Sequence, residues 1–340
     1  MQIKSNILEA IGHTPLVKLN KVVSHGAANV WAKCEFLNPS GSVKDRLALH
    51  IIEKAELSGE LKPGSVIVEN TSGNTGLGLA MVAAVKGYRC IFTMPDKMSQ
   101  EKILMLKSFG AEVVITPTDV PGDSPQHYIE TAKRIVSETP HAFYVNQYHN
   151  PLNIEAHYLY TGPEIWNQTE GNFSAIVAGV GTGGTLSGVA KYLKEKNSKI
   201  KVIGVDPFGS VHHDYFYTKK LCTPAVYKVE GIGEDVLCGA MDFSVVDEIR
   251  QVNDRDAFTM ARRLVREEGL FCGGSSGAAV YIAEQVAQEL GAGHNVVTIL
   301  PDSATRYISK YLSDDWMERQ EWESLDGKTM TSNQISASKT

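Results

Sequence analysis

The sequence predicts an α/β protein with two lobes, each built as a largely parallel sheet between two layers of helices. Short β-branched runs alternate with amphipathic helical stretches, and glycine follows several of the expected helices. This alternation occurs twice, on either side of residues 146–151. Because a helix that joins two neighbouring strands crosses over the sheet, each strand–helix–strand unit places its strands parallel.

The elements follow in order along the chain. Glycine ends the first expected helices at Gly87 and Gly110, where a left-handed residue commonly terminates a helix. The expected strands are residues 66–69, 89–94, 112–116, 175–178, 201–206 and 295–300. The expected helices are residues 43–57, 77–86, 100–109, 186–194, 256–268 and 278–290.

We expect residues 1–10 and 36–150 to form a smaller lobe, and residues 11–35 and 151–318 a larger one. Residues 207–229 mix turn and aromatic residues, which predicts a loop near the mouth of a site. The tail is polar and lacks periodicity, so we expect residues 319–340 to be disordered.

The composition indicates a soluble globular protein. Of the 340 residues, 43% are hydrophobic and 21% charged, and the net charge of −6 favours neither nucleic acid nor an anionic membrane as a partner. Five cysteines without a CxxC pair, and a start without an apolar run, predict a cytoplasmic protein with reduced thiols. His212 and His213 would face opposite sides of a strand, so we expect no metal site there.

A lysine is expected at the start of a helix. Ser42 and Asp45 match a capping box, which places Lys44 in the first turn of the predicted helix 43–57. The helix dipole disfavours a cation there, and burial would lower the pKa of the amine further. A neutral amine attacks an aldehyde to form a Schiff base. Taken alone, Lys44 fits a solvated lysine beside a cap better than a reactive amine, and its companion motifs are what favour the second interpretation.

Two glycine-containing turns between a strand and a helix are candidate anion sites. Residues 70–76 are small and polar, with exposed N–H groups at a helix N-terminus, although a capped connection without a ligand is the alternative. Residues 179–184 satisfy G-x-G-x-x-G, and Asp206 ends the next strand, as in a dinucleotide site. A nicotinamide-dependent dehydrogenase is therefore a competing hypothesis, and a purely structural turn is another.

A third turn, residues 272–277, again precedes a helix. Ser275 can offer a neutral hydroxyl to a ring nitrogen, or act as an ordinary N-cap. A reactive amine together with a phosphate-binding turn is what pyridoxal 5'-phosphate requires. The dehydrogenase hypothesis, by contrast, leaves Lys44 and residues 70–76 without a role.

The three turns together resemble the fold-type II pyridoxal-phosphate enzymes, and more narrowly the cysteine synthase and cystathionine β-synthase group, over residues 11–316. This resemblance implies a fold like that of the tryptophan synthase β-subunit and a homodimer. It implies that Lys44 holds the cofactor, that Asn74 contacts its phenolic oxygen and that Ser275 contacts its pyridine nitrogen. It assigns the phosphate to Gly181, Thr182, Gly183, Gly184 and Thr185, and the substrate to Thr71, Ser72, Thr75, Gln147, Tyr148 and Gly231.

Within this group, residues 229–233 and 301–317 are more similar to cystathionine β-synthase, although Glu234 stands where the animal enzymes have tyrosine. The implied reaction is β-replacement on L-serine or an O-activated serine by a thiol, with homocysteine giving cystathionine. Cysteine synthesis from O-acetylserine and sulfide is the alternative, and relatives that accept amines share the scaffold. Lys44 would remove the α-proton, and Tyr148, Glu230 and Glu234 are candidates at the mouth of the site.

Overall fold

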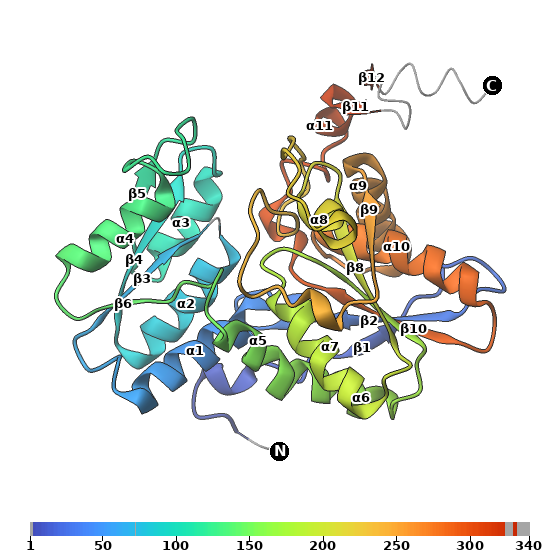
Figure 1. The fold of residues 1–340 in the computed structure, drawn as a ribbon, viewed down its shortest axis with the longest axis horizontal. Helices are drawn as coiled ribbons and strands as arrows, with labels where there is room; N and C mark the ends of the chain where they lie inside the picture. Colours follow the sequence, from blue (N-terminus) through green and yellow to red (C-terminus); the bar gives the residue numbers. More distant parts are fainter. Residues whose placement is uncertain (1–2, 72, 324–328, 332–340) are drawn as a thin grey trace.

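The computed structural model describes residues 3–71, 73–323 and 329–331. These residues form two α/β lobes, each built around one sheet, and a short two-stranded hairpin (Figure 1). The smaller sheet has the order β5-β4-β3-β6, and all its strands are parallel. Its strands are β3 (Val66–Asn70), β4 (Arg89–Pro95), β5 (Glu112–Thr116) and β6 (Ala142–Tyr144). Its helices are α1 (Lys44–Ser58), α2 (Asn74–Lys86), α3 (Gln100–Ser108) and α4 (Tyr128–Glu138).

The larger sheet has the order β1-β2-β10-β7-β8-β9, and only β1 runs antiparallel to its neighbour. Its strands are β1 (Leu16–Lys18), β2 (Asn29–Cys34), β7 (Ala175–Gly179), β8 (Lys201–Pro207), β9 (Glu248–Val252) and β10 (Asn295–Leu300). The remaining helices are α5 (Leu152–Ala156), α6 (Gly162–Thr169), α7 (Gly184–Lys196), α8 (His212–Thr218), α9 (Asp254–Arg263), α10 (Gly274–Leu290) and α11 (Asp314–Arg319). Two π-helical segments continue α5 and α9 over His157–Thr161 and Leu264–Glu268.

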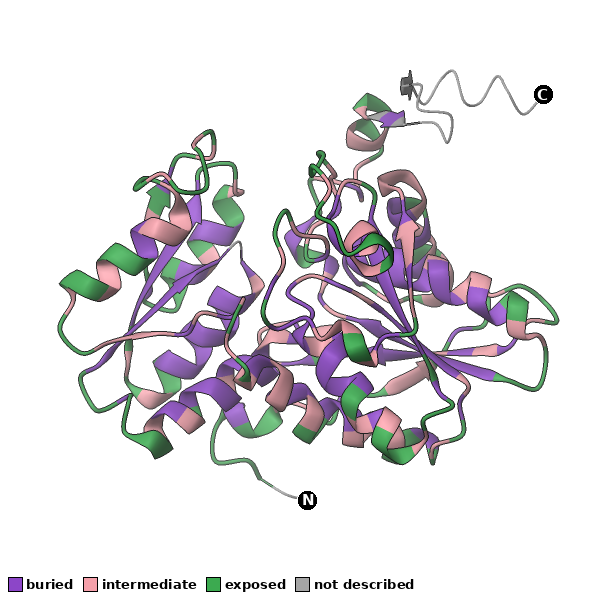
Figure 2. Cartoon of the chain, viewed as in Figure 1, coloured by how far each residue is buried: buried purple, intermediate pink, exposed green. Residues whose placement is uncertain are grey.

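Both sheets are covered on their two faces, as the continuous apolar strands predict. Successive side chains of a strand point to opposite faces. Along β7, Val177 packs with α9 and α10, whereas Ile176 packs with α6 and α7. Along β3, Ile67 packs with α1 and α2, whereas Val68 packs with α4. Figure 2 shows both sheets buried between their helices.

The predicted elements are largely confirmed, and the predicted strands at 112–116 and 295–300 coincide with β5 and β10. Strands β1 and β2 belong to the larger sheet, and β3–β6 form the smaller one. We therefore propose, as expected from the sequence, that residues 11–35 and 151–318 form the larger lobe and that residues 36–150 belong to the smaller one. No helix in the described part of the chain has the length and apolarity to cross a membrane.

Two regions differ from the expectation. Residues 207–229 are not only a loop, because α8 lies within them, so His212 and His213 belong to a helix rather than a strand. Within the expected disordered tail, β11 (Glu321–Glu323) pairs antiparallel with β12 (Thr329–Thr331), whereas residues 324–328 and 332–340 lie outside the described residues. Trp322 is buried and lies edge-on against Trp316, which gives the start of this tail an apolar anchor.

Candidate active site

A cleft of about 1200 Å³ is lined by residues that follow the strands of both sheets. It gathers nearly all the site residues predicted from the sequence, although these come from six separate segments. Gly184 is not among its lining residues, and Ser72 lies outside the described residues. The predicted residues that line it are Lys44, Thr71, Asn74, Thr75, Gln147, Tyr148, Gly181, Thr182, Gly183, Thr185, Gly231 and Ser275.

Lys44 is the first residue of α1 and faces this cleft. Burial lowers the pKa of its amine, and electrostatic interactions with Glu234, Cys238 and Asp302 only partly oppose this effect. The predicted capping box is wrong. The Asp45 carboxylate accepts the Ser40 N–H at 2.7 Å instead of pairing with Ser42. Asp45 therefore stabilises the turn before Lys44 rather than the helix start.

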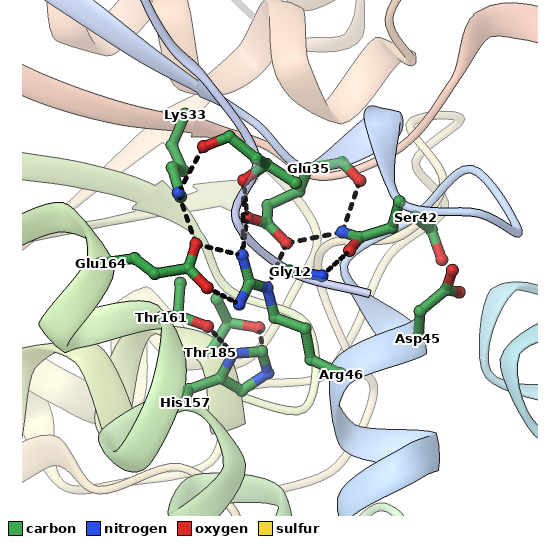
Figure 3. Close-up of polar contacts among 12 residues, drawn as sticks. Gly12, Lys33, Glu35, Ser42, Asp45, Arg46, His157, Thr161, Glu164 and Thr185 are labelled. Carbon is green, nitrogen blue, oxygen red and sulfur yellow. Dashed lines mark hydrogen bonds and ion pairs between the residues drawn. The ribbon is translucent and has the colours of Figure 1, made fainter. Parts of the chain in front are cut away.

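A buried ion network anchors the Lys44 helix to the larger sheet (Figure 3). The Arg46 guanidinium lies 2.6 Å from Glu35 and 2.7 Å from Glu164, and Lys33 lies 2.7 Å from Glu164. Burial alone would raise the pKa of Glu164, but Arg46 and Lys33 outweigh it and lower that pKa to about 2. This network was not predicted, because its members lie up to 131 residues apart.

The turn between β7 and α7 offers hydrogen-bond donors to the cleft. In the described part of the chain, the N–H groups of Gly181, Thr182 and Gly183 have no acceptor. Gly183 has a φ of +86°, and a β-carbon there would lie 2.6 Å from the side chain of Met241. Together with the N-terminus of the 13-residue helix α7, these donors suit a phosphate group.

The hydroxyls of the two threonines in this turn are hydrogen-bonded to buried side chains. The amide nitrogen of Asn153 donates to the Thr182 hydroxyl at 3.1 Å. His157 lies 3.1 Å from the Thr185 hydroxyl and 2.9 Å from Thr161, as Figure 3 shows. Burial lowers the pKa of His157 well below its usual value, so its imidazole is neutral.

The turn before α2 is shaped by one hydroxyl. Thr71 Oγ1 accepts the N–H groups of Gly73 and Gly76 at 3.1 and 3.2 Å, which holds the turn closed. Thr75 instead donates to the side-chain oxygen of Gln147 at 2.6 Å. Thr75 and Gln147 thus form one unit on the cleft wall.

Ser275 lies in the first turn of α10 and is not its N-cap, because Gly273 occupies that position. Its side chain is buried, and a β-carbon on Gly231 would lie 3.7 Å from its hydroxyl. A neutral hydroxyl at this point is the group expected for a ring nitrogen that carries no proton.

Acidic side chains line the mouth of the cleft. Glu230 forms ion pairs with Lys102 on α3 and with Lys310, so it bridges the two layers. Burial raises the pKa of Glu234 to about 8, although the nearby Lys44 amine opposes that rise. Glu234 is therefore mostly protonated at neutral pH. Tyr148 is hydrogen-bonded to Tyr128, with 3.2 Å between the two hydroxyl oxygens.

The residues present fit a phosphorylated aldehyde better than a dinucleotide. A desolvated amine, a phosphate-binding turn and a neutral hydroxyl face one space. Asp206, which a dinucleotide site would need, is fully buried, and its carboxylate accepts the His213 N–H at 2.9 Å. Among the described residues, no group of three or more His, Cys, Asp or Glu side chains is placed to bind a metal.

Comparisons with known proteins agree with this geometry. A family model described as pyridoxal-phosphate dependent enzyme matches residues 7–302. Cystathionine beta-synthase of Mus musculus is 49% identical over 318 residues, which cover 93% of this chain but 56% of that protein. Cysteine synthase of Staphylococcus aureus is 47% identical over 91% of this chain and 98% of its own length. A crystal structure of O-acetylserine dependent cystathionine beta-synthase from Helicobacter pylori aligns with a TM-score of 0.84 at 36% identity, covering 91% of this chain and 99% of that one. The chain thus spans little more than half of the mouse protein.

Proposed function

Because the chain belongs to the pyridoxal-phosphate dependent enzymes, and to their cystathionine β-synthase and cysteine synthase type, we propose that it makes cystathionine from serine and homocysteine. The dehydrogenase hypothesis is wrong, since this family uses pyridoxal phosphate. The reaction type is β-replacement, in which a thiol takes the place of the serine oxygen substituent. The observation that supports the site assignment is the convergence of Lys44, the turn at residues 181–185 and Ser275 on one cleft.

Four groups are proposed to hold the cofactor. When bound, the cofactor supplies an aldehyde for a lysine and a ring that withdraws electrons from the substrate Cα. Lys44 would carry the aldehyde, and the N–H groups of residues 181–185 would bind the phosphate. Ser275 would donate a hydrogen bond to the ring nitrogen, and Asn74 would contact the phenolic oxygen.

The amino-acid substrate is proposed to bind with its carboxylate at the Thr71–Thr75 turn and Gln147. Ser72 belongs to this set from the sequence alone. The Gln147 oxygen is occupied by Thr75, which leaves its NH₂ group for the carboxylate. Once released, the Lys44 amine has the lowered pKa that a general base at Cα requires.

The second substrate is proposed to enter past Tyr148 and Glu234. A protonated Glu234 can donate a hydrogen bond to the departing oxygen or to the carboxylate of homocysteine. Sulfide carries no such groups, so these polar side chains favour an amino-acid thiol. Cysteine synthesis is the second candidate, supported by the Staphylococcus aureus relative, whose length the chain matches almost completely.

Steady-state assays would separate the two. The purified chain, reconstituted with pyridoxal phosphate, is given serine or O-acetylserine with homocysteine or sulfide, and the product is identified by mass spectrometry. We expect cystathionine to be formed with the higher kcat/KM. Turnover of sulfide alone would establish cysteine synthesis instead. We also propose a cytoplasmic homodimer without nucleic-acid or membrane partners, which sedimentation and cell fractionation can test.

A further inference from the structure

We propose that Asp302, supported by Tyr307, is a positioning residue that orients the Asn74 amide toward the cofactor. The inference rests on the proposed function, because it assumes that Asn74 contacts the phenolic oxygen of bound pyridoxal phosphate. It adds a residue that acts on the cofactor through another side chain.

The position of Asp302 is set by the two turns that meet at the cleft. It follows Pro301 at the end of β10, and the Pro301 carbonyl accepts the Val43 N–H at 2.8 Å. The Asp302 carbonyl accepts the Gly273 N–H at 2.9 Å. Asp302 thus lies between the turn that carries Lys44 and the turn that carries Ser275.

The carboxylate of Asp302 makes two hydrogen bonds through one oxygen. Asn74 Nδ2 donates to Asp302 Oδ2 at 2.8 Å, and the Tyr307 hydroxyl donates to the same atom at 2.7 Å. Asp302 is only 1% exposed and Tyr307 only 5%, so water does not compete for these bonds.

This contact selects one orientation of the Asn74 amide. A carboxylate only accepts hydrogen bonds, so Asn74 must present its NH₂ end to Asp302. If the Asn74 amide were flipped, its oxygen would face the Asp302 carboxylate, and two acceptor oxygens would lie together without a hydrogen between them. One of the two N–H bonds of Asn74 is used by Asp302, and the other remains for a ligand in the cleft. The Asn74 oxygen has no partner among the described residues.

The charges around Asp302 are consistent with an acceptor role. Burial raises the pKa of Asp302, whereas the Arg306 guanidinium and the hydrogen bonds from Asn74 and Tyr307 oppose the rise. Arg306 is itself held by the Gly41 carbonyl at 2.9 Å. Other charged or titratable groups near this region are Lys44, Lys102, Glu230, Glu234, Cys272 and Tyr311.

The test uses the full chain reconstituted with pyridoxal phosphate, and its readout is the visible absorbance of the lysine-bound cofactor titrated with acid and base. A donor to the phenolic oxygen weakens that oxygen's hold on the proton it shares with the lysine linkage. Loss of the donor should therefore raise the titration midpoint. We expect Asn74→Ala to raise it by about half to one pH unit. Asp302→Leu and Asp302→Asn both remove a negative charge that raises the pKa of the Lys44 amine. Because only Asp302→Asn keeps an acceptor oxygen for Asn74, the midpoint of Asp302→Leu should be the higher of the two by about half to one pH unit.

A double-mutant cycle shows whether Asp302 acts through Asn74. If it does, Asp302→Leu and Asp302→Asn should have the same midpoint in an Asn74→Ala background. Asp247→Asn, at an acid that pairs with Lys194 and does not line the cleft, is the control and should not move the midpoint. Should Asp302→Leu fold poorly, Tyr307→Phe should give a smaller shift of the same sign that also vanishes in the Asn74→Ala background.

The outcomes separate this inference from the proposed function. A wild-type chain that takes up no cofactor would refute the function itself. A normal wild-type titration with an Asp302→Leu midpoint equal to that of Asp302→Asn would overturn the positioning role alone. A difference between these two variants that persists in the Asn74→Ala background would do the same, because Asp302 would then act independently of Asn74.

Discussion

The hydroxyl of Thr75 donates a hydrogen bond to the side-chain oxygen of Gln147 over 2.6 Å, which joins the first turn of α2 to the segment after β6. Both side chains are buried, so the bond is shielded from water. Since the oxygen of Gln147 is occupied, its NH₂ group faces outward as a donor for an anion.

Thr75→Val should therefore weaken substrate binding more than it slows turnover. It removes the donor without changing the size of the side chain, and Gln147 loses its fixed orientation. A hydrogen bond of ~1 kcal/mol corresponds to a rise of about fivefold in KM for the amino-acid substrate. Thr75→Ser keeps the hydroxyl and should stay near the wild-type KM. Equal KM values for the two variants would contradict the role of Thr75.

Lys44→Ala should abolish both turnover and the visible absorbance of bound cofactor. The variant lacks the amine that attacks the aldehyde and later moves the α-proton. Absorbance spectra and product assays check this directly. Lys107→Ala, at an exposed lysine near the end of α3, is the control and should behave as the wild type. A Lys44→Ala protein that still turned over would refute the site assignment.

Glu234 should give the reaction an alkaline limit near pH 8. Its pKa is raised to about 8, so its carboxyl is protonated below that pH and ionised above it. As pH rises through 8 the donor is lost, and kcat/KM should fall. Glu234→Gln carries a neutral donor at every pH and should lose this limb. Asp235→Asn, the next residue, should retain it, and an unchanged limb in Glu234→Gln would exclude Glu234 as its source.

Arg46→Met should destabilise the fold strongly. It leaves Glu35 and Glu164 buried without their main cation, and removal of one partner from a buried ion pair costs about 3–5 kcal/mol. Arg134 forms an exposed pair with Glu138, so Arg134→Met should cost less than about 1 kcal/mol. Denaturant unfolding of both variants at one protein concentration checks the contrast. Similar losses would mean that burial of the network contributes little.

Glu69 should make stability fall as the solution becomes alkaline. It is fully buried in β3, and burial raises its pKa from 4.5 to about 8. The folded chain therefore keeps a proton that the unfolded chain releases, so stability is lost between about pH 4.5 and 8. Over this range the free energy of unfolding should fall by about 1.4 kcal/mol per pH unit. Glu69→Gln should gain Tm relative to the wild type at pH 8 but not at pH 4.5, measured by thermal unfolding of the cofactor-free protein.

Local sequence patterns were enough to predict most of the helices and strands and most of the residues that line the cleft. Residues 295–300 are rich in β-branched and apolar side chains and are followed by Pro301, which was enough to predict β10. Short strands such as β1 and β6, with only partly buried residues, gave no comparable period. Gly181 and Lys44 were recognisable because each lies between a strand or turn and a helix, where the chain itself supplies donors or a dipole.

Contacts between distant segments were not predictable from one sequence. Nothing local to Glu164 indicates that it pairs with Lys33 and Arg46, because that pairing depends on how α6 packs beside β2. The expected pairing of Ser42 with Asp45 failed for a related reason. Asp45 has a competing donor in Ser40, five residues earlier, and the tight turn brings that donor closer.

Helix α1 packs its apolar side against α2. In its first turn, Arg46 forms ion pairs with Glu35 and Glu164 beside the larger sheet. These ion pairs fix the N-terminal end of α1 beside the larger sheet. If the smaller lobe moves to widen the mouth of the cleft, its displacement would be smallest near Arg46 and would increase toward β4 and β5. Lys44, two residues from Arg46, would then keep its distance from Gly181 throughout each cycle of entry and release.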